Sequence, residues 1–350
     1  MINKKLNIIF IVVATATLLF ITIITYKLIF KTENPSLFEI DFDKKAHIIS
    51  SFGALIGSLL TFLSIIFVVY TVIQQKEQYN NDKYLEAEKE RNALFDRLKL
   101  VHNLLNEISK HVTETGTQMK SFFNKEKEYP LANNMMSFYT NKDYYMFLEL
   151  DFQSIFSSFQ MFSDESDKTK SFNSLYKYVD FYSESITEQK EKFQYHIKDK
   201  YERKQKVAYE LNDIMDDASR MIEEYKTEFS EGQKYKDKLW YQILNGLIAS
   251  YYDRITEKDE ADFELIETEV LYVFLRDADL VRKEIGFEKR TQDLALKIAS
   301  IRKQLFSIKM ESFDFADQME RRFSDYYSSE STSFKKLNEL NDKISDLLKR

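Results

Sequence analysis

The sequence contains no cysteine, and it has only two prolines and six glycines among 350 residues. The absence of cysteine excludes disulfides, thiolate metal sites and cysteine nucleophiles, and it suits a reducing compartment. So few turn-forming residues favour long helices over a sandwich or barrel, in which tight turns are frequent. No stretch shows a sustained alternation of apolar and polar residues, so strands should be few or absent. These absences predict an all-α fold.

Aromatic residues make up 15% of the chain, which is enough for a hydrophobic core and argues against disorder. The net charge is −7; residues 1–80 carry seven lysines against five acidic residues, so the remainder is near −9. An acidic body of this kind has no overall attraction for nucleic acid, and we expect no nucleic-acid partner. The chain also has no nucleotide-binding loop, zinc-binding helix or nucleophile elbow, so we expect no metal and no cofactor.

Two apolar stretches near the N-terminus are long enough to cross a bilayer. Residues 48–73 contain no charged side chain over 26 positions, against the roughly 20 residues that a transmembrane helix needs. Residues 6–26 form a second apolar run, for which a secretory signal peptide is the alternative. The run is too long for that, and no small-residue cleavage site follows it, so we interpret it as an uncleaved helix. We predict a transmembrane helical hairpin, with spans of about 6–26 and 48–73.

The distribution of lysine and arginine sets the expected orientation of the hairpin. The connection between the spans carries four such residues, whereas the two outer flanks together carry six: Lys4, Lys5, Lys76, Lys83, Lys89 and Arg91. This excess favours both ends on the inside, and the missing cysteines agree with it. We therefore expect a multi-pass membrane protein, with the lipid bilayer as a partner and the soluble domain in the cytoplasm.

A small-residue motif lies in the second span. Gly53 and Gly57 form a GxxxG pattern next to Ser58, and such small residues let helix backbones approach closely in lipid. The motif packs either against the first helix, through Ala14 and Ala16, or against a second copy of the chain.

An apolar seam with a heptad spacing follows the second span. Such a seam forms either the core-facing side of a bundle helix or an oligomeric coiled-coil stalk, and the first plausible end of its helix is Gly116. Together with the GxxxG motif, the seam favours a homo-oligomer held together at its membrane end. The seam residues are Leu94, Leu98, Val101, Leu105, Ile108 and Val112.

The rest of the chain predicts a helical-bundle cytoplasmic domain. Pro130 marks a loop, so we predict a transmembrane hairpin over residues 1–76, a helical stalk over 77–128 and a helical domain over 129–350. Breaks are expected at 164–170, at Gly232 and at Gly286. Helices are expected over 144–162, over 171–230 (one or two), and over 240–255, 263–285, 294–306 and 334–348. The predicted buried seam of 171–230 is Phe193, Ile197, Tyr201, Val207, Leu211, Ile214, Ala218, Met221 and Tyr225.

One pair of residues permits a catalytic hypothesis. Arg97 and His102 match the R-x4-H spacing of HEPN-type ribonucleases, which are all-helical proteins of bacterial defence. An arginine can hold a phosphate and a histidine can move the proton of a 2′-hydroxyl. Both residues also flank the heptad seam, where solvation explains them equally well. His196 lies in a segment rich in lysine and glutamate, and we interpret it as a solvated residue.

The order of elements over residues 48–110 resembles the phage abortive-infection proteins of the AbiC type. The resemblance is carried by the second span with its Tyr-x-x-x-Gln exit and by the Phe-Leu-His-Asn-like helix after it. This resemblance covers about sixty residues. A later block of that family is similar to Tyr241–Asn245 with Tyr251 and Tyr252. Asn245 departs from the family there, because an arginine is expected at its position. The matching positions are Gly53, Gly57, Tyr70, Gln74, Gln75, Phe95, Leu98, His102 and Asn103.

This resemblance implies an antiphage protein anchored in the bacterial inner (cell) membrane, which halts infection at the expense of the host cell. It supplies no catalytic residues, so binding and self-association, with a phage-derived protein as the trigger, are expected rather than catalysis. Two alternatives stay open. One is a membrane-tethered scaffold or sensor without an antiviral role, and the other is a helical ribonuclease that uses Arg97 and His102.

Overall fold

The computed structural model describes residues 2–30, 42–163, 168–228, 235–256, 262–282 and 289–349. The described residues form helices and contain no strand, so the predicted all-α fold is confirmed for this part of the chain. They divide into two compact units, residues 1–93 and 94–350. The domain boundaries predicted from the sequence lie at residues 76 and 128.

The first unit pairs helix α1 (Ile2–Phe30) with the beginning of helix α2 (Phe42–Glu128). The two helices run antiparallel, because Phe10, near the start of α1, stacks on Tyr70 with ring centroids 4.8 Å apart. Both contain apolar windows that are long enough to cross a membrane by length and composition, and neither window is buried within the protein. A core helix of a soluble protein would be mostly buried. Of the predicted connection over 31–47, residues 42–47 belong to α2 instead, and residues 31–41, with Pro35, lie outside the described residues.

The GxxxG motif does not face α1. The half-exposed side chains of the second span recur every three or four residues, at Ile56, Leu59, Leu63, Ile66 and Tyr70, and they mark the side of α2 that α1 covers. Each residue turns a helix by about 100°, so Gly53 and Gly57 lie about 100° and 140° around the helix from the centre of this side. Accordingly, a Cβ added at Gly53 or Gly57 would meet nothing within 4 Å. Of the two predicted alternatives, packing of the motif on the first span is thus not seen in this structure.

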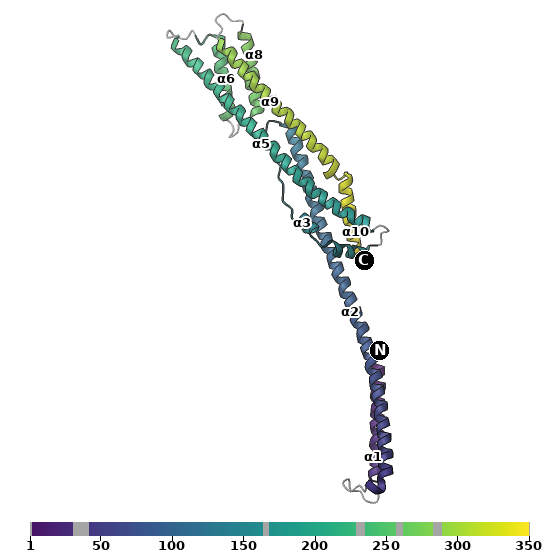
Figure 1. Cartoon of the computed structure of the whole chain (residues 1–350). Coiled ribbons are helices and arrows are strands. Elements are labelled where there is room, and N and C mark those ends of the chain that lie inside the picture. Colours follow the sequence, from purple (N-terminus) through teal and green to yellow (C-terminus); the bar gives the residue numbers. More distant parts are fainter. Residues whose placement is uncertain are drawn as a thin grey trace. The chain divides into compact units, whose positions relative to one another are not determined.

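The second unit contains two hydrophobic cores joined by long helices. Core A includes Leu105, Phe147, Tyr182, Met319 and Leu337. Core B includes Leu131, Leu211, Trp240, Ile266 and Ile298. Helices α5 (Lys168–Glu228) and α9 (Lys289–Arg322) lie side by side and contribute to both cores (Figure 1). The remaining elements are α3 (Asp143–Leu148), α4 (Phe152–Phe162), α6 (Leu239–Thr256), α7 (Phe263–Leu265), α8 (Tyr272–Val281), α10 (Thr332–Leu348), and the π-helical turns η1 (Ile266–Leu271) and η2 (Phe323–Tyr327).

The heptad seam after the second span is part of core A. Leu98, Val101, Leu105, Ile108 and Val112 are each at most 1% exposed, and Leu94 is half-buried. They pack in the same core as residues of α5 and α10 from the same chain. The prediction of an oligomeric stalk built on this seam is therefore wrong. The seam is the core-facing side of a bundle helix, because the partners that cover it come from later in the sequence.

Gly116 does not end α2, which continues to Glu128. A Cβ at Gly116 would lie 3.0 Å from the backbone oxygen of Tyr327 and 3.1 Å from its Cβ. The glycine therefore lets α2 approach turn η2 closely, which is a packing role and not a helix stop.

Several predicted helices have different bounds in the structure. The predicted helix over 144–162 is divided into α3 and α4, with Asp151 capping α4 by accepting a hydrogen bond from the backbone N–H of Gln153 at 3.3 Å. Residues 168–228 form one helix, which is one of the two predicted alternatives, and α9 extends well beyond the predicted 294–306. The helices α6 and α10 confirm the predicted segments 240–255 and 334–348. Of the break predicted at 164–170, residues 168–170 belong to α5 instead, and residues 164–167 lie outside the described residues, as do Gly232 and Gly286.

Candidate functional site

The structure brings His102, but not Arg97, into a hydrogen-bonded arrangement. His102 Nδ1 lies 3.0 Å from Oδ1 of Asn341 on α10, and Nε2 lies 3.1 Å from Nδ2 of Asn106. Asn341 Nδ2 in turn donates to Asn106 Oδ1 at 2.6 Å. Because Nδ1 faces an acceptor and Nε2 faces a donor, these contacts fit the tautomer that carries its proton on Nδ1. Both ring nitrogens are thus used in joining α2 to α10.

Arg97 is exposed and makes no ion pair or hydrogen bond within the part of the chain that the structure describes. Five positions separate it from His102, which places the two residues about 140° apart around the helix axis. A phosphate held by Arg97 would not lie over the His102 ring. The pair therefore forms no assembled acid–base site in this structure.

A buried polar cluster lies at the C-terminal end of α2. Glu126, at the end of α2, is 0% exposed, and its Oε1 accepts hydrogen bonds from Lys200 Nζ at 2.6 Å and from His196 Nε2 at 2.9 Å. Its Oε2 accepts from Asn134 Nδ2 at 2.8 Å. We call Glu126, Asn134, His196 and Lys200 the Glu126 cluster. The His196 ring also stacks on Phe315, with centroids 4.1 Å apart.

These contacts correct two predictions about α5. His196 is not a solvated residue, because its side chain is only 11% exposed and bonds to Glu126. Tyr201, which was predicted to belong to the buried seam, is 52% exposed, whereas Lys200 is 3% exposed. The sequence did contain a sign that these lysines are buried: Lys200 and Lys204 continue the seam spacing that runs from Phe193 and Ile197 to Val207.

Burial and hydrogen bonding act in opposite directions on the charges of this cluster. Burial alone would raise the pKa of Glu126, but the hydrogen bonds from His196, Lys200 and Asn134 outweigh burial and hold this pKa below its usual value of 4.5. Burial lowers the pKa of Lys200, against the attraction of Glu126, which raises it. Glu126 is therefore kept as a carboxylate that the three donors share.

The cluster lies at the junction of the two cores. Along α5, Lys200 and Lys204 fall between Phe193, a core A residue, and Val207, a core B residue. On α9, the buried Ser312 separates the two cores in the same way, and its hydroxyl has no hydrogen-bond partner among the described residues. The two cores are thus divided by a layer of buried polar side chains.

The loop between α2 and α3, residues 129–142, bridges this junction. Leu131 is buried in core B, and its backbone N–H donates to Glu264 Oε1 at 2.9 Å. Asn133 Oδ1 accepts from Lys204 Nζ at 2.6 Å, and Met136 is buried in core A. Asn134 also donates to the backbone oxygen of Tyr129 at 2.9 Å, which satisfies a carbonyl group beside the C-terminus of α2. The loop is therefore held on both cores.

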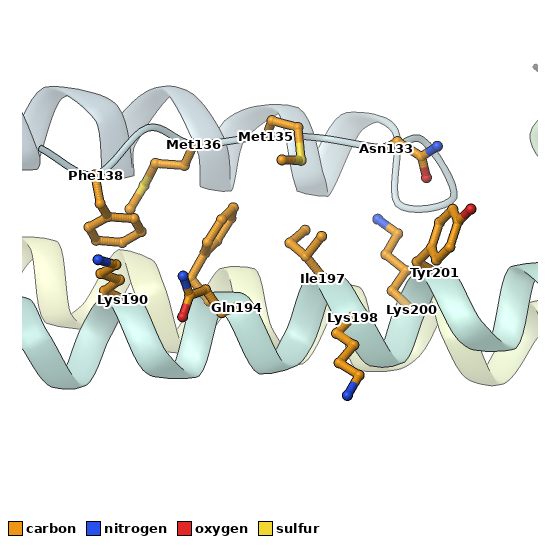
Figure 2. Close-up of a pocket in the computed structure, with 11 residues that line it drawn as sticks. Asn133, Met135, Met136, Phe138, Lys190, Gln194, Ile197, Lys198, Lys200 and Tyr201 are labelled. Atoms are coloured by element: carbon orange, nitrogen blue, oxygen red, sulfur yellow. The ribbon is translucent and has the colours of Figure 1, made fainter.

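A groove runs between this loop and α5 (Figure 2). Its volume is about 770 Å³, within the range of roughly 300–1,000 Å³ that is typical of small-molecule sites. Met135, Met136 and Phe138 line it from the loop, and Phe193 and Ile197 line it from α5. Three lysines line it as well, namely Lys190, Lys198 and Lys200, and no acidic residue does. This groove is the candidate functional site, and no prediction from the sequence identified it.

Other polar groups offer no competing site in the described residues. No group of three histidine or acidic side chains that could hold a metal ion occurs there. Two acidic residues in the second half of α5 bond to basic residues of α9: Asp217 accepts from Lys297 at 2.7 Å, and Glu224 accepts from Arg290. The buried His111 bonds to the hydroxyl of Tyr144 and to the backbone oxygen of Tyr139, at 3.2 and 3.0 Å, and so holds the end of the loop.

The fold and the groove define a class: an all-helical protein with two candidate membrane spans and a two-core body that carries a groove at the core junction. No protein-family model matches the chain, and no curated protein and no solved structure shows significant similarity to it. Its function is therefore inferred from its own geometry and from the resemblance of residues 48–110.

Proposed function

We propose that this protein is a membrane-anchored antiphage protein of bacteria that acts by binding, and that its binding site is the groove between α5 and the 129–142 loop. The observation that carries the binding role is the position of this groove. The loop that forms one wall is held by Leu131 in core B and by Met136 in core A. A molecule in the groove would therefore contact the one loop that bridges the cores, and its binding energy could shift their packing.

The antiphage role comes from the resemblance to abortive-infection proteins, in which growth arrest follows infection. A phage-derived protein is the proposed trigger, and the bacterial inner membrane, with the soluble domain in the cytoplasm, is the proposed location. The two unburied apolar windows support a membrane anchor. Self-association is proposed through Gly53, Gly57 and Ser58, because the side of α2 that carries the two glycines is open in the protomer.

Binding is favoured over ribonuclease chemistry by the surroundings of His102. Both ring nitrogens are engaged by Asn341 and Asn106. A general acid or base must instead reach the proton that it transfers. Arg97 points to another side of the helix. The ribonuclease is therefore the weaker alternative, and a scaffold or sensor without an antiviral role is the stronger one.

Phage plating on cells that carry or lack the gene tests the proposal. We expect protection by the wild-type protein and loss of protection by Ile197→Trp, because Ile197 points into the groove (Figure 2) and an indole would fill it. Tyr195→Trp is the matched control, since Tyr195 is 74% exposed on the same helix and does not line the groove. All variants must accumulate to the wild-type level.

The other outcomes separate the alternatives. If cells with the wild-type gene are fully susceptible to every phage of a panel, the antiphage role is excluded in favour of the scaffold or sensor. Loss of protection by His102→Ala at normal protein level, together with preserved RNA in infected cells, would instead favour the ribonuclease. Equal protection by wild type and Ile197→Trp would remove the groove from the mechanism.

A further inference from the structure

We propose that the groove binds an anionic amphipath, a single-chain molecule with an apolar tail and a carboxylate or phosphate head. The inference rests on the proposed binding function, for which it names the class of ligand. It follows from three features of the groove: its length, its apolar walls, and the sign of the charges along it.

The walls suit an alkyl tail. The groove extends along α5 from Lys190 to Tyr201, a distance of about 16 Å at the helical rise of about 1.5 Å per residue. Over the middle of this distance, Met135 of the loop faces Ile197 of α5, and the side chain of Met136 extends toward Phe138 (Figure 2). Methionine side chains are unbranched and flexible, so they can adapt to a tail of variable conformation.

The charges suit an anionic head at one end of the groove. Lys200 is already bonded to Glu126, and Lys198 points away from the loop (Figure 2) and pairs with Glu202. Lys190 is half-buried beside Phe138, and it has no ion pair or hydrogen bond within the described ranges. The Lys190 ammonium group is thus the available cation at the Phe138 end.

A small amphipath fits this groove better than a peptide does. The buried backbone of a bound peptide needs a hydrogen-bond partner for each N–H and C=O group. The helical wall offers few, because the backbone groups of α5 are used within the helix, so a peptide would depend on the loop backbone and on Gln194 for these partners. The polar side chain of Asn133 already accepts from Lys204. An alkyl tail has no such requirement. A protein with two candidate spans would also work beside a bilayer, which is a source of such molecules.

The experiment is photolabelling of the full-length protein in bacterial membranes with dodecanoate that carries a diazirine in its tail. Mass spectrometry of the digested protein locates the labelled peptides. We expect label on residues 133–138 and 190–201, in addition to label on the membrane spans, which serves as an internal reference. Unlabelled dodecanoate should remove the groove label, and each methylene added to the competitor should strengthen competition about fourfold until the groove is filled.

The head group is tested by competitors and by variants. Dodecyl phosphate and dodecanoate should both compete, their ratio distinguishing a phosphate from a carboxylate ligand, whereas dodecanol should compete about tenfold less well. Lys190→Gln should reduce the groove label about tenfold and leave the span label unchanged, and Lys190→Arg should restore it. Lys198→Gln is the control, because the loss of a nearby charge that points away should change the groove label less than twofold.

Three results would overturn the inference. These are label on the spans alone, equal competition by dodecanol and dodecanoate, and undiminished groove label in Lys190→Gln. If the groove stays unlabelled while Ile197→Trp still abolishes phage protection, the amphipath is wrong, the proposed function stands, and the groove belongs to a peptide partner. If the groove is labelled as expected but Ile197→Trp still protects, the ligand class holds and the proposed function fails.

Discussion

The sharpest test of the structure concerns the Glu126 cluster. Replacing Glu126 by methionine keeps an unbranched side chain of similar length but leaves Lys200, whose side chain is 4% exposed, without its carboxylate partner. Breaking a buried ion pair from one side typically destabilises a protein by about 3–5 kcal/mol. For a domain of this size, the expected fall in Tm is roughly 6–20 °C.

A double-mutant cycle gives the coupling between the two residues. Lys200→Met should also destabilise the fold, because it leaves a buried carboxylate with fewer donors. The double variant Glu126→Met/Lys200→Met should be less destabilised than the sum of the two single changes by about 2 kcal/mol or more, because neither charge is then left without its partner. Two apolar side chains can replace a buried ion pair at little net cost.

The assay is thermal unfolding of the full chain in mild detergent, followed by circular dichroism. Lys127→Met is the matched control on the adjacent position of α2. Lys127 pairs with Asp317 and Glu320, both at 2.6 Å, but these partners are about half exposed. Its loss should therefore change the free energy of unfolding by about 1 kcal/mol or less. A Tm for Glu126→Met equal to that of Lys127→Met, or single effects that simply add, would refute the buried network.

Three further predictions concern the pH dependence of stability, the packing of two glycines and self-association. The folded-state pKa of Glu126 lies below the usual 4.5, so its carboxylate contributes stability that is fully present above pH 4.5 and is lost as pH falls through the folded-state pKa. The fall in Tm at acid pH should therefore be smaller in Glu126→Met than in the wild type. Identical pH profiles of Tm would contradict this. Gly116→Ala should destabilise the fold by about 1–3 kcal/mol through its contact with Tyr327, whereas Gly246→Ala, in α6 with nothing within 4 Å, should stabilise it by up to about 1 kcal/mol; melting curves that rank the two alike would argue against the packing at η2. Gly57→Ile should lower the oligomer mass measured in detergent without lowering Tm. A wild-type protein that is monomeric under mild solubilisation would contradict the proposed self-association.

The heptad seam shows which features of the fold could be predicted from the sequence and which could not. Its spacing established that one side of α2 after residue 93 is apolar and must be covered. The spacing could not say whether the cover comes from another copy or from the same chain, because both satisfy one periodicity. The structure decides for the same chain, with partners such as Leu337, more than two hundred positions away. The glycines of the second span pose the same question, and there the protomer leaves the face open.

The sequence by itself determined the local properties of this protein. The scarcity of proline and glycine and the lack of period-two alternation predicted long helices without strands, and uncharged apolar runs identified both candidate spans. These features depend on neighbours along one helix, so they can be read from adjacent positions.

Tertiary structure alone decided the site. Glu126 lies 70 and 74 positions from His196 and Lys200, and a glutamate among charged neighbours at a helix end gives no sign of burial. Likewise, only the close approach of η2 explains Gly116, which in sequence signals a helix end. The groove arises because the 129–142 loop is held on two cores at once, and that condition depends on contacts between segments that are far apart in the chain.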